Sequence, residues 1–161
     1  ESMMSTEDIA KAKKLIEEYI QEKPSKGADK SVQMTAVNEA VSPEDLRKFL
    51  KFNGVYRTEK INNSFWHYIR FYEDGTVITV NSSGTPDEIK SWFNKENITS
   101  DELPHGKYQV VGDKLIFSSV SKERTINYKG KIQESKLYLD IFSETNVRQG
   151  GGQFNFTAFS K

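Results

Sequence analysis

Hydrophobic and polar residues alternate with a period of two along most of the chain, from Phe52 to Phe159. Leu137, Leu139 and Ile141, for example, fall on one face of a strand and are separated by Tyr138 and an acid. Turn-forming Asn, Asp and Gly residues interrupt this alternation at short intervals. The pattern predicts eight strands, at residues 52–60, 65–72, 76–82, 107–111, 114–120, 124–133, 136–143 and 153–159.

The short connections between successive strands favour antiparallel neighbours over crossover connections. Eight such strands can close on themselves, which removes exposed sheet edges. The sequence therefore predicts a mainly β fold, an eight-stranded antiparallel up-and-down barrel. The interior of such a barrel holds packed side chains or one small ligand. Five residues are expected in its core: Tyr56, Leu137, Leu139, Phe154 and Phe156.

Helical spacing replaces the alternation before the first strand. Residues 5–22 carry a narrow apolar stripe, and residues 23–41 are composed like a linker. Ser42 and Pro43 form the start of a short helix over residues 43–50, with Ser42 as its cap. We therefore divide the chain into residues 1–48, which hold the N-terminal helix, linker and short helix, and a barrel domain over residues 49–161.

One further helix is predicted between the third and fourth strands, at residues 86–95. It begins with the capping-box sequence Thr85-Pro86-Asp87-Glu88. Trp92 and Phe93 share its apolar face with Ile89. We expect this helix to lie over one opening of the barrel, with Trp92 and Phe93 turned toward it.

The second predicted strand is unusual because both of its faces are aromatic. One face carries Phe65, His67, Ile69 and Phe71, and the other carries Trp66, Tyr68, Arg70 and Tyr72. The short helix at residues 42–50, the N-terminal helix or a protein partner is expected to cover the outer face. Among these aromatic residues, the guanidinium of Arg70 can bind a carboxylate, stack on a tyrosine, or pair with Glu73 or Asp74.

Composition excludes several functional classes. The 23 basic and 23 acidic residues balance to a net charge of zero, so nucleic-acid binding through counterion release is not expected. The absence of cysteine excludes disulfides, thiolate zinc sites and cysteine nucleophiles. No apolar run approaches the roughly 18 residues of a membrane span. A soluble protein is expected, either cytoplasmic or exported after removal of a signal segment.

Catalytic and metal motifs are also missing from the sequence. His67 and His105 are too far apart in sequence to form a ligand pair of the usual spacing. The pair Asp87-Glu88 is explained by helix capping, and the glycines at 150–152 are interpreted as a flexible hairpin. No nucleophile has a neighbouring base. We therefore predict no catalytic residue, no metal, no cofactor and no enzymatic activity.

Two features resemble the lipocalin-like barrels of the calycin group. Phe52-Asn53-Gly54-Val55-Tyr56-Arg57 is similar to the Gly-x-Trp opening of lipocalins, with Tyr56 in place of the tryptophan. The eight strands in up-and-down order are the second feature. Lipocalins also carry a late arginine that covers the floor aromatic; here Arg148 lies just before the last predicted strand.

A longer stretch resembles the C-terminal domain of the family of F-box only protein nine. The residues that carry this resemblance are Tyr68-Ile69-Arg70-Phe71-Tyr72-Glu73-Asp74-Gly75-Thr76-Val77, Thr85-Pro86, His105-Gly106-Lys107-Tyr108, Tyr128-Lys129-Gly130 and Phe154-Asn155-Phe156. The resemblance covers residues 52–159 and implies a lipocalin-like fold with a binding role. No F-box helix pattern or tetratricopeptide repeat precedes it, so a ubiquitin-ligase role is not implied.

These observations favour a binding domain for a small apolar or amphiphilic ligand inside the barrel. The alternative is a protein–protein interaction module that uses the barrel surface and the N-terminal helix. A hollow interior would favour the first, and a filled interior with a broad apolar patch would favour the second. The candidate ligand-binding residues are Tyr56, Arg57, Trp66, Tyr68, Arg70, Trp92 and Tyr128.

Overall fold

The computed structural model describes Lys14 and residues 43–99 and 103–161. The chain divides into two units, residues 1–40 and Val41–Lys161. The helix predicted at residues 5–22, the linker and the cap residue Ser42 fall outside the described residues, apart from Lys14. The second unit contains every strand of the described chain.

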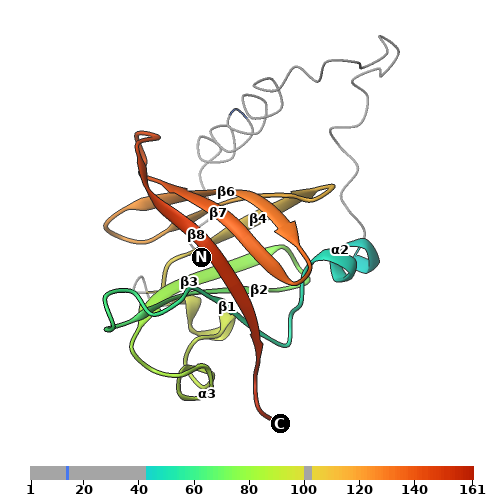
Figure 1. Ribbon diagram of the computed structural model, residues 1–161, viewed down its shortest axis with the longest axis vertical. Coiled ribbons are helices and arrows are strands. Elements are labelled where there is room, and N and C mark those ends of the chain that lie inside the picture. The colour runs from blue at the N-terminus through green and yellow to red at the C-terminus, as the bar shows by residue number, and fades with distance from the viewer. Residues whose placement is uncertain (1–13, 15–42, 100–102) are drawn as a thin grey trace. The chain divides into compact units, whose positions relative to one another are not determined.

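Eight antiparallel strands form a closed barrel in chain order, as predicted (Figure 1). Each strand pairs with its neighbours in sequence, and the first pairs with the last through Gly54↔Ala158 and Tyr56↔Phe156. The strands are β1 (Gly54–Arg57), β2 (Trp66–Phe71), β3 (Thr76–Ser82), β4 (His105–Val111), β5 (Lys114–Val120), β6 (Thr125–Gln133), β7 (Lys136–Phe142) and β8 (Arg148–Ala158).

An aromatic cluster fills one half of the barrel interior. Phe71 lies at its centre and meets Tyr56, Tyr108 and Phe117 edge to face, with ring centroids 5.6, 5.0 and 5.6 Å apart. Edge-to-face contacts add stability beyond the buried area of the rings. Aliphatic residues from strands β2 to β7 complete this half of the core: Ile69, Val77, Val110, Leu115, Ile132, Leu137 and Leu139.

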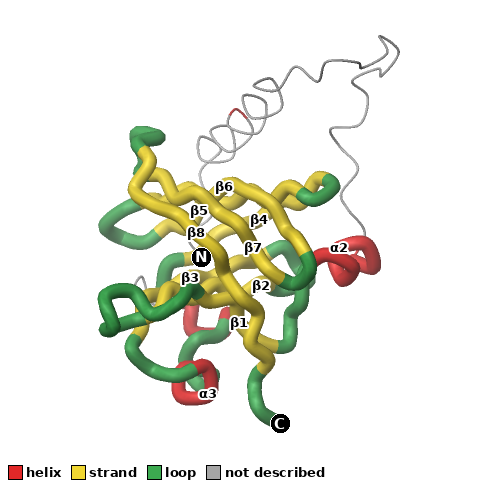
Figure 2. The backbone as a smooth tube through the Cα atoms, viewed as in Figure 1, coloured by secondary structure: helices red, strands yellow, loops and turns green. Residues whose placement is uncertain are grey.

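The short helix α2 (Pro43–Phe49) lies beside the filled half of the barrel (Figure 2). Its apolar residue Leu46, and Leu50 just after it, belong to the same buried cluster as Tyr56 and Phe71. The Lys51 backbone N–H donates to the Tyr56 hydroxyl at 3.0 Å, which fixes the chain as it leaves the helix. Tyr56 thus connects the chain that follows α2 to the barrel interior.

Four of the five predicted core residues are buried, namely Tyr56, Leu137, Leu139 and Phe154. The prediction for Phe156 is wrong in degree, because this ring is only half-buried. It shares the interior face with Phe154 but lies one residue pair nearer the end of β8, where it contacts Tyr56 and the Lys51 ammonium.

The segment between β3 and β4 packs on the outer face of the barrel and not over an opening, which corrects the prediction. It contains α3 (Pro86–Ile89) and a 3-10 helix, η1 (Lys95–Thr99). Its residues Ile89, Phe93 and Leu103 form a second buried cluster with Val55, Tyr68 and Ile78, from the outer faces of β1 to β3. We call residues 83–99, with Leu103, the outer strap.

The helix predicted at residues 86–95 ends early, because asparagine side chains bind the backbone carbonyls that would continue it. The Glu88 carboxylate accepts from the Thr85 N–H and hydroxyl, so the predicted capping box is present. Further on, the side-chain amides of Asn94 and Asn97 donate to the carbonyls of Ser91 and Trp92. A continuing α-helix would need those carbonyls for its own backbone. Phe93 remains buried, whereas Trp92 turns outward.

Three outward side chains, from β2 and the residue after it, hold the strap by its backbone. The Tyr68 hydroxyl donates to the Gly84 carbonyl at 2.8 Å, and Arg70 donates to the Phe93 carbonyl at 2.6 Å. The Tyr72 hydroxyl accepts from the Lys95 N–H at 2.9 Å. The aromatic outer face of β2 is therefore covered by the β3–β4 connection, and not by the short helix at residues 43–49.

The packed cluster predicts unequal costs for two phenylalanine truncations. Phe71→Ala removes a fully buried ring and should lower the free energy of unfolding by about 3–5 kcal/mol. Phe156→Ala removes a half-buried ring, so its cost should be clearly smaller. Urea denaturation of both variants measures this difference, and equal losses would contradict the assignment of Phe156 to the edge of the core.

The outward turn of Trp92 predicts efficient fluorescence quenching. In a Trp66→Phe background, Trp92 becomes the remaining tryptophan, and its side chain is 41% exposed. Acrylamide should therefore quench its emission nearly as strongly as that of free tryptophan in solution. Weak quenching would mean that the strap folds Trp92 against the barrel.

Candidate ligand cavity

A cavity of about 920 Å³ opens at the end of the barrel away from α2. Its lining comes from the C-terminal ends of β3, β5 and β7 and the N-terminal ends of β2, β6 and β8. These ends meet because neighbouring strands run antiparallel. The barrel is thus packed in one half and hollow in the other, and the cavity has the size of a small-molecule site.

A polar network forms the floor of this cavity. The Tyr128 hydroxyl lies 2.9 Å from Nε2 of His67, and Nδ1 of His67 is hydrogen-bonded to the Asn81 side-chain oxygen. Because that oxygen accepts, Nδ1 carries the proton and Nε2 accepts from Tyr128. Thr79 and Ser119 continue the network through a hydroxyl–hydroxyl bond of 2.7 Å.

Both titratable members of the network are neutral at neutral pH. Burial lowers the pKa of His67 below its usual value; the Arg124 charge acts in the same direction, and the Asn81 hydrogen bond opposes it. Burial raises the pKa of Tyr128 to about 12, against a hydrogen bond from Thr79 and the charge of Arg124. The floor therefore offers neutral hydrogen-bonding groups and no ion.

Apolar side chains form part of the cavity wall, among many hydroxyl and amide side chains. Phe65, Ile126 and Ile141 are half-buried and line it, and Phe154 closes it from below with its edge toward the His67 ring, at 5.6 Å between centroids. The His67 ring also stacks on Tyr128, with an interplanar angle of 22°. A ligand that enters the cavity meets hydrocarbon and ring faces.

The glycine run of β8 helps to keep this half of the barrel hollow. The interpretation of Gly150, Gly151 and Gly152 as a flexible hairpin is wrong, because all three pair with β7 inside the sheet. Gly150 and Gly152 share the interior face with Phe154, and a Cβ atom on either would meet no atom within 4 Å. Gly151 has a φ of 152° and would clash with the Leu139 carbonyl if it carried a side chain.

Three charged residues surround the cavity mouth. Glu123 and Arg124 precede β6, and Glu144 follows β7. The Glu144 carboxylate accepts from the Thr125 N–H, which holds it against the start of β6. Of the three, Arg124 alone acts on the pKa of both His67 and Tyr128. Its guanidinium therefore has the strongest influence on the floor.

The structure separates the seven predicted ligand-binding residues. Tyr128 lines the cavity, and Tyr56 lies in the filled half of the barrel. The other five lie on the outside: Arg57 and Trp66 stack on each other, Tyr68 and Arg70 bind the strap, and Trp92 projects from it. Arg148 also faces outward and pairs with Asp140 at 2.9 Å, so it does not cover Tyr56.

Sequence reasoning missed several residues that line the cavity, chiefly Thr79, Asn81, Ser119 and Arg124. The alternation of β3 and β5 does contain a signal, because Thr79 follows Val77, and Ser119 follows Leu115 and Phe117, on the interior faces of their strands. Buried hydroxyls need partners, and each of these two residues supplies one for the other. That signal could have pointed to a polar floor.

Comparisons with known proteins provide no family for the chain. No protein family, no curated protein and no solved structure matches it at a significant level. Within the described ranges, no group of three or more His, Asp or Glu side chains is arranged to hold a metal ion. No described helix has the length and hydropathy needed to cross a bilayer.

The buried histidine predicts a pH-dependent stability. Because the pKa of His67 is lowered on folding, the unfolded chain takes up the proton first as the pH falls. The free energy of unfolding should therefore decrease below about pH 6.5, by up to about 1.4 kcal/mol per pH unit. His67→Gln should flatten this decrease between about pH 6.5 and 5.

Urea denaturation across this range measures the effect. His105→Gln is the matched control, because His105 lies outside the cavity and bonds to the Leu103 carbonyl. If the free energy of unfolding of His67→Gln keeps the wild-type pH dependence, another titratable group causes the loss of stability at acidic pH.

Proposed function

We propose that the barrel is a non-enzymatic binding domain that holds one small apolar or amphiphilic molecule in its open half. The observation that carries this proposal is the cavity of about 920 Å³, which has apolar side chains in its wall and a hydrogen-bonding floor. Concave, mostly apolar pockets with a few converging polar groups are the usual form of small-molecule sites. The resemblance to lipocalin-like, calycin barrels points in the same direction.

The glycines of β8 support binding over simple packing. Gly150 lines the cavity and carries no side chain there, so it leaves space that a leucine or valine would otherwise fill. Glycine inside a strand also weakens it, because it gains no packing and loses more entropy on folding. Glycines that lower the stability of β8 next to the cavity are consistent with a strand that leaves room for a ligand.

The hydrogen bonds of the His67 ring support binding without catalysis. Both of its nitrogens are hydrogen-bonded, one to Asn81 and one to Tyr128. A general base must reach the proton that it removes from the substrate, and neither nitrogen is left for that task. The proposal accordingly assigns this network to ligand orientation.

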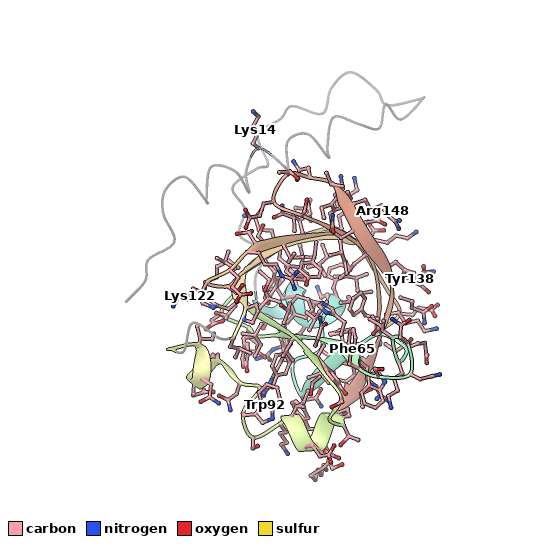
Figure 3. All side chains as sticks on the ribbon, turned by 90° about the vertical axis from the view of Figure 1, so that its left-hand side faces the viewer. Lys14, Phe65, Trp92, Lys122, Tyr138 and Arg148 are labelled. Atoms are coloured by element: carbon pink, nitrogen blue, oxygen red, sulfur yellow. The ribbon has the colours of Figure 1, made fainter. Side chains whose placement is uncertain are left out.

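A small ligand is also supported over a protein partner by the described surface. Its exposed large hydrophobic residues are spread over two strands, the strap and two connections: Ile61, Trp92, Val111, Tyr138 and Val147. Trp92 and Tyr138 lie well apart in Figure 3. A protein-binding face would be expected to gather such residues in one patch.

Blocking the cavity from β8 tests the proposal. Gly150→Leu places an apolar side chain in open interior space, and the backbone there does not require glycine. The neutral dye N-phenyl-1-naphthylamine should bind the wild-type protein with a saturable fluorescence increase. Gly150→Leu should weaken this binding by about tenfold or more without lowering the free energy of unfolding.

Two variants serve as controls for this measurement. Gln153→Leu adds the same side chain to the exposed outer face of β8, and Arg70→Gln changes a residue of the outer face of β2. Both should bind the dye as the wild type does. Failure of the wild type to bind, or equal binding by Gly150→Leu, would refute the proposal.

A further inference from the structure

The mouth and the floor of the cavity differ in the charge that they can accept. The floor carries no charge, and its His67, Tyr128, Thr79 and Ser119 groups are hydrogen-bonded to protein, so burying an ion there would require desolvation without a counter-charge. A charged group on a ligand must therefore remain at the mouth. The side chains of the mouth thus determine which charge is accepted.

Arg124 is the rim residue placed to receive an anion. None of the ion pairs within residues 43–99 and 103–161 involves its guanidinium. Glu144, by contrast, is held by the Thr125 N–H. Arg124 also influences both His67 and Tyr128, whereas neither Glu123 nor Glu144 does so. Arg124 lines the cavity, so the rim presents there a positive charge that belongs to none of these ion pairs.

Asn81 adds a neutral donor next to this charge. It lies on the interior face of β3, lines the cavity and is exposed there. Its side-chain oxygen is occupied by Nδ1 of His67, so its amide N–H groups remain for a ligand. No hydrogen bond from this amide nitrogen to another described residue is present. An amide donor and a guanidinium together suit a carboxylate.

The inner wall favours a flat ring. Both nitrogens of His67 are engaged, so this residue offers a ligand only the face of its ring. Phe154 and Tyr128 are buried behind the His67 ring and support it, and the half-buried ring of Phe65 also lines the cavity. Offset and edge-on ring contacts give such surfaces a preference for aromatic ligands.

We infer that the cavity binds an organic monoanion with a planar ring, whose ring lies against the His67 ring and whose acid group is held at the mouth by Arg124 and the Asn81 amide. This inference rests on the proposed function, because it specifies the ligand class of the same cavity. It moves the carboxylate-binding role that the sequence suggested for Arg70 to an arginine of the β5–β6 connection.

Isothermal titration with 2-naphthoate and its neutral isostere 2-naphthamide tests the charge preference. The wild type should bind the carboxylate about five- to tenfold more tightly, as a partly exposed, hydrogen-bonded ion pair allows. Arg124→Gln should abolish this preference, and the affinity for 2-naphthamide should remain. Lys122→Gln is the matched control, because it removes an exposed charge two residues away that does not line the cavity.

Further ligands and variants distinguish failure of this inference from failure of the proposed function. Decanoate, a carboxylate of similar carbon number, should bind more weakly than 2-naphthoate if the wall selects a ring. Equal binding of naphthoate and naphthamide, both blocked by Gly150→Leu, would overturn the monoanion inference and leave the proposed function standing. Tighter binding of decanoate would overturn the ring preference. Loss of preference in Lys122→Gln would overturn the role of Arg124. Absence of any binding, or binding unaffected by Gly150→Leu, would overturn both proposals.

Discussion

Closure of eight strands into a barrel creates an interior that must be filled or left hollow. In this protein, side chains fill the interior at one end and leave it hollow at the other. Phe71 and the three aromatic rings that meet it edge to face occupy the half next to α2. At the other end, glycines and short hydroxyl side chains take the corresponding positions on β8, β3 and β5. The filled half supplies rigid walls on which the open half is built, so the cavity depends on the cluster below it.

Strand β2 connects the two sides of this architecture. Its inward residues His67, Ile69 and Phe71 run from the cavity floor to the centre of the packed cluster. Its outward residues Tyr68 and Arg70 bind the backbone of the outer strap. A strand that is buried on both faces carries apolar and aromatic residues at consecutive positions. The aromatic run at residues 65–72 is therefore explained by two layers of packing around a single strand.

The fold was largely predictable from the sequence, because period-two alternation and turn residues are local signals. They located all eight strands, and most of the predicted strands differ from the structure by no more than one residue at either end: β2, β3, β5, β6 and β7. The outer strap was not predictable in the same way. Its helix ends where Asn94 and Asn97 capture backbone carbonyls, and its position depends on partners in β2 that are distant in sequence.

The candidate site was harder to predict for a related reason. Aromatic residues and arginines were predicted to contact a ligand, yet Tyr68 and Arg70 bind the backbone of the outer strap. The cavity is instead marked by what is small or missing, namely Gly150, Thr79 and Ser119. Small side chains form a void only when the register brings them together, and the register of β8 against β7 is not visible in the sequence.

The pairing of β1 with β8 has a consequence for the order of events during synthesis on the ribosome. The first strand of the barrel begins at Gly54, and its partner ends at Ala158, about a hundred residues later. Until β8 leaves the exit tunnel, β1 and β7 both present unpaired backbone groups, which are templates for association with other chains. The nascent barrel is therefore open for most of its translation, and a chaperone that shields β1 would act before the last strand arrives.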